Sequence, residues 1–167
     1  HEYLEQTARS ILNQTYPYFE WVIVNDGRKD KETIELLDKI QKMDNRIKVL
    51  FHENSGPAAT RDYGAKHTSE STEYLFFLDA DDLIDKTYLE CAYWTLETNR
   101  EASFAYADCL GFGSLNYLWR KWFTLKEEKK NNILVLTAMI RKKDFFEVGG
   151  YGIKEKGVSE DWNFWLK

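Results

Sequence analysis

Apolar residues along the chain follow two different spacings. Short runs rich in β-branched residues predict strands, and apolar residues three or four positions apart predict amphipathic helices. The predicted strands are residues 21–24, 47–51, 74–78, 103–107 and 133–140, and the predicted helices are residues 4–12, 34–45, 57–68, 86–98, 143–148 and 160–167. Residues 109–131 are polar and aromatic without a regular spacing, and they receive no assignment.

The alternation of strands and helices predicts an α/β fold with a mostly parallel sheet. In open sheets of this kind, ligands bind beyond the carboxyl ends of the strands. Two acidic turns directly follow predicted strands, one at Asp26 and one at residues 79–82. We therefore expect both turns to face one crevice. No linker, repeat or low-complexity segment interrupts the sequence, so residues 1–167 are expected to form a single domain.

Composition narrows the class of protein. Of the 167 residues, 43% are hydrophobic and 31% are charged, as in an ordinary soluble globular domain. The longest apolar run, Tyr74 to Leu78, is far shorter than the ~20 residues of a membrane-spanning helix. A net charge of −5 argues against a nucleic-acid partner. We interpret Cys91 and Cys109 as reduced thiols, and because no signal peptide is visible, the expected location is the cytoplasm.

The turn Asp79-Ala80-Asp81 carries the first candidate chemistry. Two neighbouring carboxylates suit Mg²⁺ or Mn²⁺, with waters and substrate phosphates completing the coordination. The structural alternative is a solvated turn whose Asp side chains accept hydrogen bonds from the following amides. Sugar-nucleotide transferases, nucleotidyltransferases and phosphohydrolases of the haloacid-dehalogenase type all use acidic turns. Leu83 stands where those phosphohydrolases usually have Thr or Val, and two predicted strands precede the motif, so a transferase is favoured.

Five segments then occur in a distinctive order. They are residues 22–27, 54–64, 77–82, 149–151 and 159–162, with the sequences VIVNDG, NSGPAATRDYG, FLDADD, GGY and SEDW. Together they resemble the family-2 glycosyltransferases, which are inverting enzymes with the GT-A fold, a Rossmann-like three-layer α/β/α architecture. The resemblance implies a nucleotide-sugar donor, most often a UDP sugar, and Mn²⁺ or Mg²⁺ as the metal.

The resemblance assigns a donor-binding role to four residues. Asp26 matches the acidic residue that typically hydrogen-bonds the donor base, and Arg61 matches an arginine placed near the nucleotide. A guanidinium with five donors suits a base edge or a diphosphate, although a surface ion pair is the structural alternative. Asp79 and Asp81 match the motif that holds the metal and the diphosphate.

The resemblance also places the catalytic carboxylates near the end of the chain. Asp161 matches the base that activates the acceptor, and Glu160 is given a supporting role. The structural alternative for both is a carboxylate at a helix N-terminus, where the helix dipole favours negative charge.

Some features depart from the family pattern. Arg28-Lys29 replaces the common Ser-Thr pair, and Asp62 replaces the common Asn after the arginine. The usual first strand does not precede His1, and the chain stops at Lys167 before the usual acceptor-side elements. We therefore expect a fragment of a GT-A domain, and peripheral membrane association of the full-length protein, at the inner face of the membrane, stays open.

The resulting expectation is an inverting glycosyltransferase. It would move a sugar from a UDP-type donor to a hydroxyl acceptor, a saccharide or a glycolipid, in bacterial polysaccharide or glycolipid synthesis. Two alternatives remain. One is a metal-dependent phosphohydrolase or nucleotidyltransferase that uses the Asp79–Asp81 turn, and the other is a non-catalytic protein that only binds nucleotide sugars.

Overall fold

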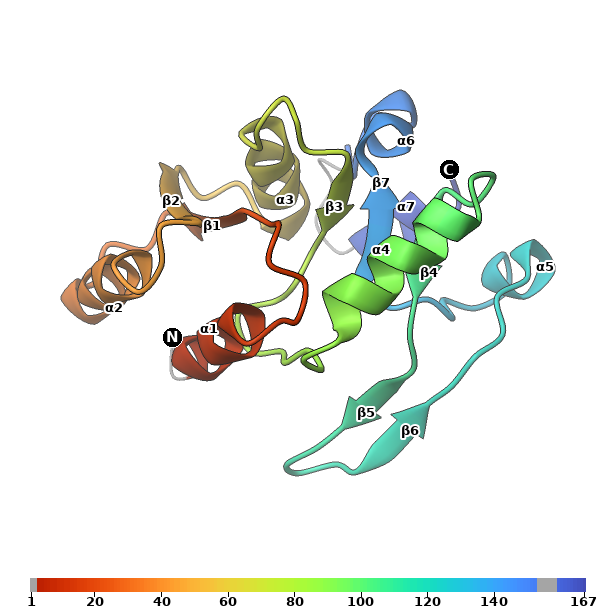
Figure 1. The fold of residues 1–167 in the computed structure, drawn as a ribbon, viewed down its shortest axis with the longest axis horizontal. Coiled ribbons are helices and arrows are strands. Elements are labelled where there is room, and N and C mark those ends of the chain that lie inside the picture. Colours follow the sequence, from red (N-terminus) through yellow and green to blue (C-terminus); the bar gives the residue numbers. More distant parts are fainter. Residues whose placement is uncertain (1–2, 153–158) are drawn as a thin grey trace.

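The computed structural model describes residues 3–152 and 159–167, and helices alternate with strands along most of this length (Figure 1). The helices are α1 (Leu4–Leu12), α2 (Lys31–Gln41), α3 (Pro57–Lys66), α4 (Tyr88–Thr98), α5 (Leu125–Glu128), α6 (Lys142–Glu147) and α7 (Glu160–Trp165). The strands are β1 (Trp21–Asp26), β2 (Ile47–His52), β3 (Tyr74–Phe76), β4 (Phe104–Tyr106), β5 (Cys109–Gly111), β6 (Tyr117–Trp119) and β7 (Ala138–Arg141). The elements predicted for the first 107 residues are therefore confirmed, with shifted ends.

Strand pairing combines parallel and antiparallel contacts. β1 and β2 pair in parallel, from Trp21 opposite Ile47 to Asp26 opposite His52. β7 lies between β3 and β4 and runs antiparallel to both. The expected parallel pairing is thus present in β1 and β2, whereas β7 departs from it. β7 follows a hairpin and the short helix α5 rather than a long helical crossover, so the connection that makes neighbouring strands parallel is missing.

Helices cover both faces of the strands and give three layers. Along β7, Met139 faces α4, whereas Ala138 and Ile140 face the opposite side. On that opposite side, α3, α6 and α7 enclose the largest core, which includes Phe145 and Tyr151. The helices α1 and α2 form a further core with β1 and β2. The predicted three-layer arrangement is therefore present in the described residues.

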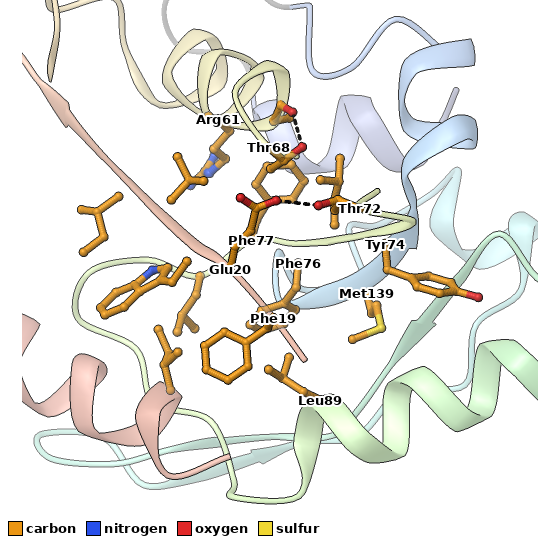
Figure 2. A pocket seen from close by; sticks show the side chains of 18 of the residues that line it. Phe19, Glu20, Arg61, Thr68, Thr72, Tyr74, Phe76, Phe77, Leu89 and Met139 are labelled. Carbon is orange, nitrogen blue, oxygen red and sulfur yellow. Dashed lines mark hydrogen bonds between the residues drawn. The ribbon is translucent and has the colours of Figure 1, made fainter. Parts of the chain in front are cut away.

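A cavity of about 850 Å³ lies between β1 and β3, whose facing edges do not pair (Figure 2). Its lining is largely apolar and includes Val22 and Leu75. Glu20 also lines the cavity, and its carboxylate accepts a hydrogen bond from the hydroxyl of Thr72 at 2.5 Å. Arg61 also lines the cavity, so the cavity adjoins the residues that the sequence marks as functional.

The strand predicted for residues 133–140 is wrong in its first half, because β7 begins only at Ala138. The amides of Ile133 and Leu134 donate instead to Glu128 Oε2, at 3.1 and 3.3 Å. Glu128 is fully buried, and its carboxylate holds these two amides away from any strand partner. Residues 109–131, unassigned from the sequence, form the β5–β6 hairpin and α5.

Candidate active site

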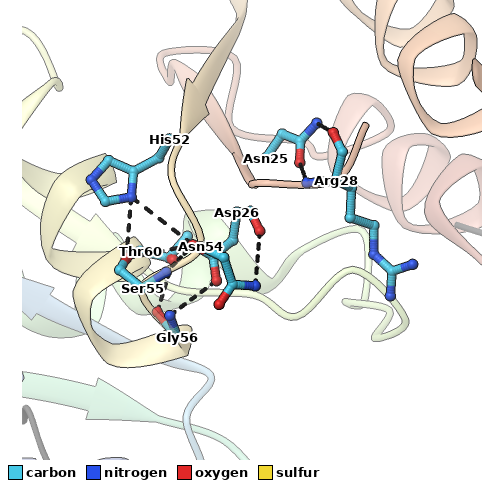
Figure 3. A network of polar contacts seen from close by, with 8 residues as sticks. All are labelled: Asn25, Asp26, Arg28, His52, Asn54, Ser55, Gly56 and Thr60. Carbon is cyan, nitrogen blue, oxygen red and sulfur yellow. Dashed lines mark hydrogen bonds and ion pairs between the residues drawn. The ribbon is translucent and has the colours of Figure 1, made fainter. Parts of the chain in front are cut away.

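Asp26 ends β1, and its carboxylate holds the loop that leads into α3 (Figure 3). Its Oδ1 accepts a hydrogen bond from the amide of Ser55 at 2.8 Å, and its Oδ2 accepts one from the amide of Gly56 at 3.1 Å. The side-chain amide of Asn54 donates to the Asp26 carbonyl oxygen at 3.2 Å. Because Gly56 is the N-cap residue of α3, the carboxylate lies at the positive end of the helix dipole.

These contacts keep the Asp26 carboxyl ionised. Burial alone would raise its pKa, but hydrogen bonds from Ser55, Thr60 and Gly56 outweigh that effect and lower the pKa. Asp26 is therefore a charged acceptor at the carboxyl end of β1, as the sequence predicts. That it hydrogen-bonds a donor base stays a prediction.

Arg61, on α3, joins the acidic turn of residues 79–82, called the acidic turn from here on, to the start of α7. Its Nη2 donates to Asp79 Oδ1 at 2.8 Å, and its Nη1 donates to Glu160 Oε1 at 3.0 Å. The guanidinium carbon lies 5.5 Å from the ring centroid of Tyr151. Burial would lower the pKa of Arg61, but the two carboxylates raise it. Three predicted site residues thus meet in one ion-pair network.

The backbone of the acidic turn is hydrogen-bonded to α1 through a buried hydroxyl group. Thr7 Oγ1 lies 3.0 Å from the carbonyl oxygen of Ala80 and 2.9 Å from that of Asp82. Asp81 is exposed, and the side chain of Asp79 is half-exposed. The backbone of the turn is therefore fixed while its carboxylates remain accessible to a ligand.

The carboxylates of this turn repel one another. Partial burial and the charges of Asp79 and Asp81 raise the pKa of Asp82. Within residues 3–152 and 159–167, no three His, Cys, Asp or Glu side chains are placed to hold a metal by themselves. Mg²⁺ commonly binds one or two carboxylates and completes its shell with waters and substrate phosphates. Asp79 and Asp81 fit a divalent cation of that kind, which would also relieve the repulsion.

Asp161, in the first turn of α7, is held at both carboxylate oxygens. Oδ1 accepts hydrogen bonds from the Ser159 hydroxyl at 2.6 Å and the Trp162 amide at 2.8 Å, and Oδ2 accepts one from Asn132 Nδ2 at 3.0 Å. Burial would raise the pKa of Asp161, but the hydrogen bonds from Ser159, Asn132 and Trp162 lower it overall. The carboxylate is therefore ionised and fixed in orientation.

A buried tyrosine lies among these charges. Burial raises the pKa of Tyr151, the Arg61 cation lowers it, and the charges of Asp161 and Asp79 raise it further. Tyr151 is thus within electrostatic reach of both acidic groups. Its ring stacks on Phe164 of α7, with the centroids 4.9 Å apart. The site is therefore built directly on the largest core.

Asp62 ties α3 to the turn that precedes α7. Its two carboxylate oxygens accept hydrogen bonds from the amides of Tyr151, at 2.9 Å, and Gly152, at 3.0 Å. Gly150 has φ +62°, and a Cβ there would lie 2.5 Å from Asp62 Oδ1. Only glycine fits this approach without strain, which explains the Gly-Gly-Tyr sequence in physical terms.

Sequence reasoning did not assign Thr7, Asp62 or Asn132 to the site. Asp62 directly follows Arg61, and its position in that motif was the one signal that could have drawn attention to it. Thr7 is a polar residue on an amphipathic helix, and Asn132 follows a segment without regular spacing. Their roles depend on contacts between residues far apart in the chain, which no local pattern predicts.

Comparison with known proteins identifies the family of the chain. The family model described as Glycosyl transferase family 2 matches residues 1–153. The chain belongs to this family. Over 91 residues, this family-2 chain is 38% identical to Glycosyltransferase GlyA of Streptococcus pneumoniae serotype 4 (strain ATCC BAA-334 / TIGR4), a match that covers 54% of the chain and 13% of GlyA. Over 90 residues, it is 38% identical to TuaG of Bacillus subtilis (strain 168), a glycosyltransferase that its name links to teichuronic acid biosynthesis, with 53% of the chain and 34% of TuaG covered.

Solved structures of S. aureus TarS share the fold. TarS 1-349 in complex with UDP-GlcNAc aligns with a TM-score of 0.75 and 22% identity, covering 98% of this family-2 chain and 48% of TarS 1-349. A second crystal structure of TarS 1-349 aligns with a TM-score of 0.72 and 24% identity, covering 96% of this chain and 49% of TarS 1-349. The expected GT-A α/β fold is confirmed. The chain spans about half of the TarS structures and less of GlyA and TuaG.

Proposed function

We propose that this family-2 domain transfers a sugar, with inversion, from a UDP-linked donor to a hydroxyl group of a saccharide or glycolipid. The ion-pair network of Arg61 carries the proposal, because it joins Asp79 of the acidic turn to Glu160 at the start of α7. The UDP-GlcNAc complex of TarS, a protein of the same fold, supports a donor of this class.

On the donor side, Asp26 and Arg61 would bind the nucleotide. Asp26 is a charged acceptor that could take a hydrogen bond from the N–H of a uracil ring. Arg61 offers a fixed, permanently charged fork of donors that suits a diphosphate. Asp79 and Asp81 would hold Mn²⁺ or Mg²⁺ together with the diphosphate. When bound, the metal would supply charge stabilisation for the leaving diphosphate.

On the acceptor side, Asp161 would act as the general base. Its ionised carboxylate takes the proton of the acceptor hydroxyl as the hydroxyl oxygen bonds to the anomeric carbon. The bond from that carbon to the diphosphate oxygen breaks on the opposite side, which inverts the configuration. Glu160, paired with Arg61, keeps the start of α7 beside the acidic turn.

Product analysis tests the proposal directly. The full-length protein is incubated with UDP-N-acetylglucosamine and other UDP sugars, with and without saccharide acceptors. Acceptor-dependent release of UDP with formation of a glycoside supports transfer. Release of inorganic phosphate would instead identify a phosphohydrolase. Binding of UDP sugars with no product under any acceptor would identify a non-catalytic binding protein.

The metal assignment predicts that Asp81→Ala abolishes the metal dependence of UDP binding. UDP affinity of the unchanged protein should rise at least ~10-fold with Mn²⁺, because a cation held by Asp79 and Asp81 would attract the negatively charged diphosphate. The variant should bind equally in Mn²⁺ and in chelator, as measured by calorimetry. Asp38→Ala, at an exposed Asp on α2, is the matched control and should behave as the unchanged protein. Equal UDP affinity of the unchanged protein in metal and chelator would remove the metal from the proposal.

The base-binding role predicts a selective effect of Asp26→Ala, which removes the acceptor. Loss of a hydrogen bond to a charged group costs about 1.5–3 kcal/mol, so UDP binding should weaken by roughly 10- to 150-fold. Inorganic diphosphate, which lacks the base, should lose much less affinity in the same titration. Equal losses for UDP and diphosphate would restrict Asp26 to its observed role of holding Ser55 and Gly56.

A further inference from the structure

Exposed apolar side chains gather on the β5–β6 hairpin and the segment that follows it. Of the seventeen large apolar side chains that are exposed in the described residues, seven lie within residues 110–125. They are Leu110, Phe112, Leu115, Tyr117, Leu118, Trp122 and Leu125. Trp122 is 86% exposed and Leu115, at the hairpin tip, is 71% exposed. Such a concentration of exposed apolar residues indicates an interaction surface.

The hairpin is an exposed two-stranded ribbon that extends away from the rest of the fold (Figure 1). Leu110 and Leu118 lie opposite each other across the two strands, and both are more than half exposed. The other face is tied to the body of the protein, because Trp119 Nε1 donates to the Ile133 carbonyl oxygen at 2.9 Å. The ribbon therefore has an anchored face and a free apolar face.

The two strands are also locked in register. A Cβ at Gly111 would lie 2.0 Å from the ring of Tyr117, so this ring covers the glycine directly. The position of the free apolar face is thus set by side-chain packing as well as by backbone pairing.

Charge distinguishes this surface from the rest of the chain. Residues 108–131 contain five basic and three acidic side chains, a net charge of +2, whereas the whole chain carries −5. All five basic residues are exposed; Arg120 pairs with Asp108 at 2.6 Å, and Glu128, another of the three acids, is buried. The five are Arg120, Lys121, Lys126, Lys129 and Lys130. An apolar surface bordered by basic residues therefore lies on an otherwise acidic protein.

This combination fits one kind of partner. Leucine and phenylalanine side chains enter the hydrocarbon edge of a bilayer, Trp and Tyr prefer its interface, and Lys and Arg bind anionic headgroups. A second copy of the chain fits less well, because contact through this surface would bring five basic residues of each copy together. Among the described residues, none of the helices has both the length and the apolar character of a membrane-spanning segment.

We propose that residues 109–126 form a membrane-docking surface, which inserts the tip and free face of the β5–β6 hairpin into the interface of an anionic lipid bilayer. Phe112 and Leu115 enter first, Trp122 lies at the headgroup level, and the basic residues contact anionic headgroups. The side chain of Trp119 is hydrogen-bonded to the backbone of Ile133, and the neighbouring Asn132 is hydrogen-bonded to Asp161. The docked hairpin would therefore hold Asp161 at a fixed distance from the lipid surface.

Vesicle co-sedimentation tests the proposal with the chain itself. Binding is expected to vesicles of phosphatidylglycerol and phosphatidylcholine, and it should weaken as salt rises. Binding to pure phosphatidylcholine should be at least ~10-fold weaker, because several basic residues near an anionic surface each contribute.

Paired substitutions separate the apolar and basic contributions. Phe112→Ser with Leu115→Ser should weaken binding at least ~10-fold, because two apolar side chains leave the bilayer. The matched control, Met43→Ser with Phe51→Ser, changes exposed apolar residues elsewhere and should have no effect. Lys121→Gln with Lys126→Gln should weaken binding about 25-fold, since each basic residue contributes about fivefold. Lys31→Gln with Lys42→Gln, on α2, is its control.

The outcomes are decisive because these side chains are exposed and the variants should keep their circular dichroism and melting temperature. Absence of binding to anionic vesicles, equal binding to neutral vesicles, or unchanged binding of the hairpin variants would each overturn the proposal. A dimer in sedimentation equilibrium that dissociates in the Phe112→Ser, Leu115→Ser variant, without vesicle binding, would assign the surface to self-association instead.

Discussion

Asp161→Asn is expected to lower the turnover of the full-length protein at least ~100-fold while leaving its affinity for the UDP sugar nearly unchanged. The acceptor hydroxyl is a poor nucleophile, and an amide cannot take its proton in the transition state. The residues proposed to bind the donor, which are Asp26, Arg61 and the acidic turn, are not altered by the substitution. Single-turnover rates and donor titrations measure the two quantities separately.

Two comparisons make this expectation specific. Glu160→Gln should cost less turnover, because Glu160 pairs with Arg61 and is not the proposed base. Asn132→Ala removes a hydrogen bond that lowers the pKa of Asp161, so the acid limb of turnover against pH should move to higher pH. Near-normal transfer by Asp161→Asn, or loss of the donor together with turnover, would leave Asp161 as a helix-start carboxylate only.

Phe145→Ala is expected to lower the free energy of unfolding by about 3–5 kcal/mol. Phe145 is 1% exposed, and its ring lies 5.3 Å from that of Phe77, 5.9 Å from Tyr151 and 5.5 Å from Phe164. Removing it leaves a cavity between β3, α6 and α7 that the surrounding rings cannot fill. The loss of stability should be accompanied by weaker donor binding, because α7 carries Glu160, which pairs with the proposed donor-binding residue Arg61.

The adjacent Phe146 provides a matched control. It lies on the same short helix but is 39% exposed, so Phe146→Ala should cost much less stability. Urea denaturation of both variants measures the difference through the shift of the midpoint at constant slope. Equal losses for the two variants would show that the core around Phe145 does not determine the stability of this region.

Local patterns were sufficient for the first part of the fold. Apolar runs predict β1 to β4, and Pro57 marks the first turn of α3 as predicted. The same patterns failed where a single buried side chain decides the backbone. Ile133 and Leu134 look like the beginning of a strand, but Glu128 accepts hydrogen bonds from their amides. A single buried carboxylate in a segment whose apolar residues have no regular spacing gives no periodic signal.

In the candidate site, too, local sequence patterns predict some features, whereas contacts between distant residues decide others. Asp26, Asp79 and Asp81 follow strands, so their position at the carboxyl edge follows from the sequence alone. The link from Asp79 to α7 does not follow from the sequence. It depends on Arg61, whose second partner, Glu160, lies 99 positions away in the chain. Only the assembled structure shows that one guanidinium binds both acidic groups.

The long sequence distance between Arg61 and its partner Glu160 affects the order in which the contacts form during folding. Arg61 and Asp62 leave the ribosome well before their partners Glu160 and Tyr151, which lie 99 and 89 positions further along the chain. Contacts between such distant residues require the closure of a long loop and form late. The early segment through α3 can therefore fold around its own local contacts, while the contacts of Arg61 with Glu160 and of Asp62 with Tyr151 form later. A nascent chain that has not reached residue 160 is therefore expected to be structured in part but to lack the ion pair between Arg61 and Glu160, so the proposed site assembles only after α7 has been synthesised.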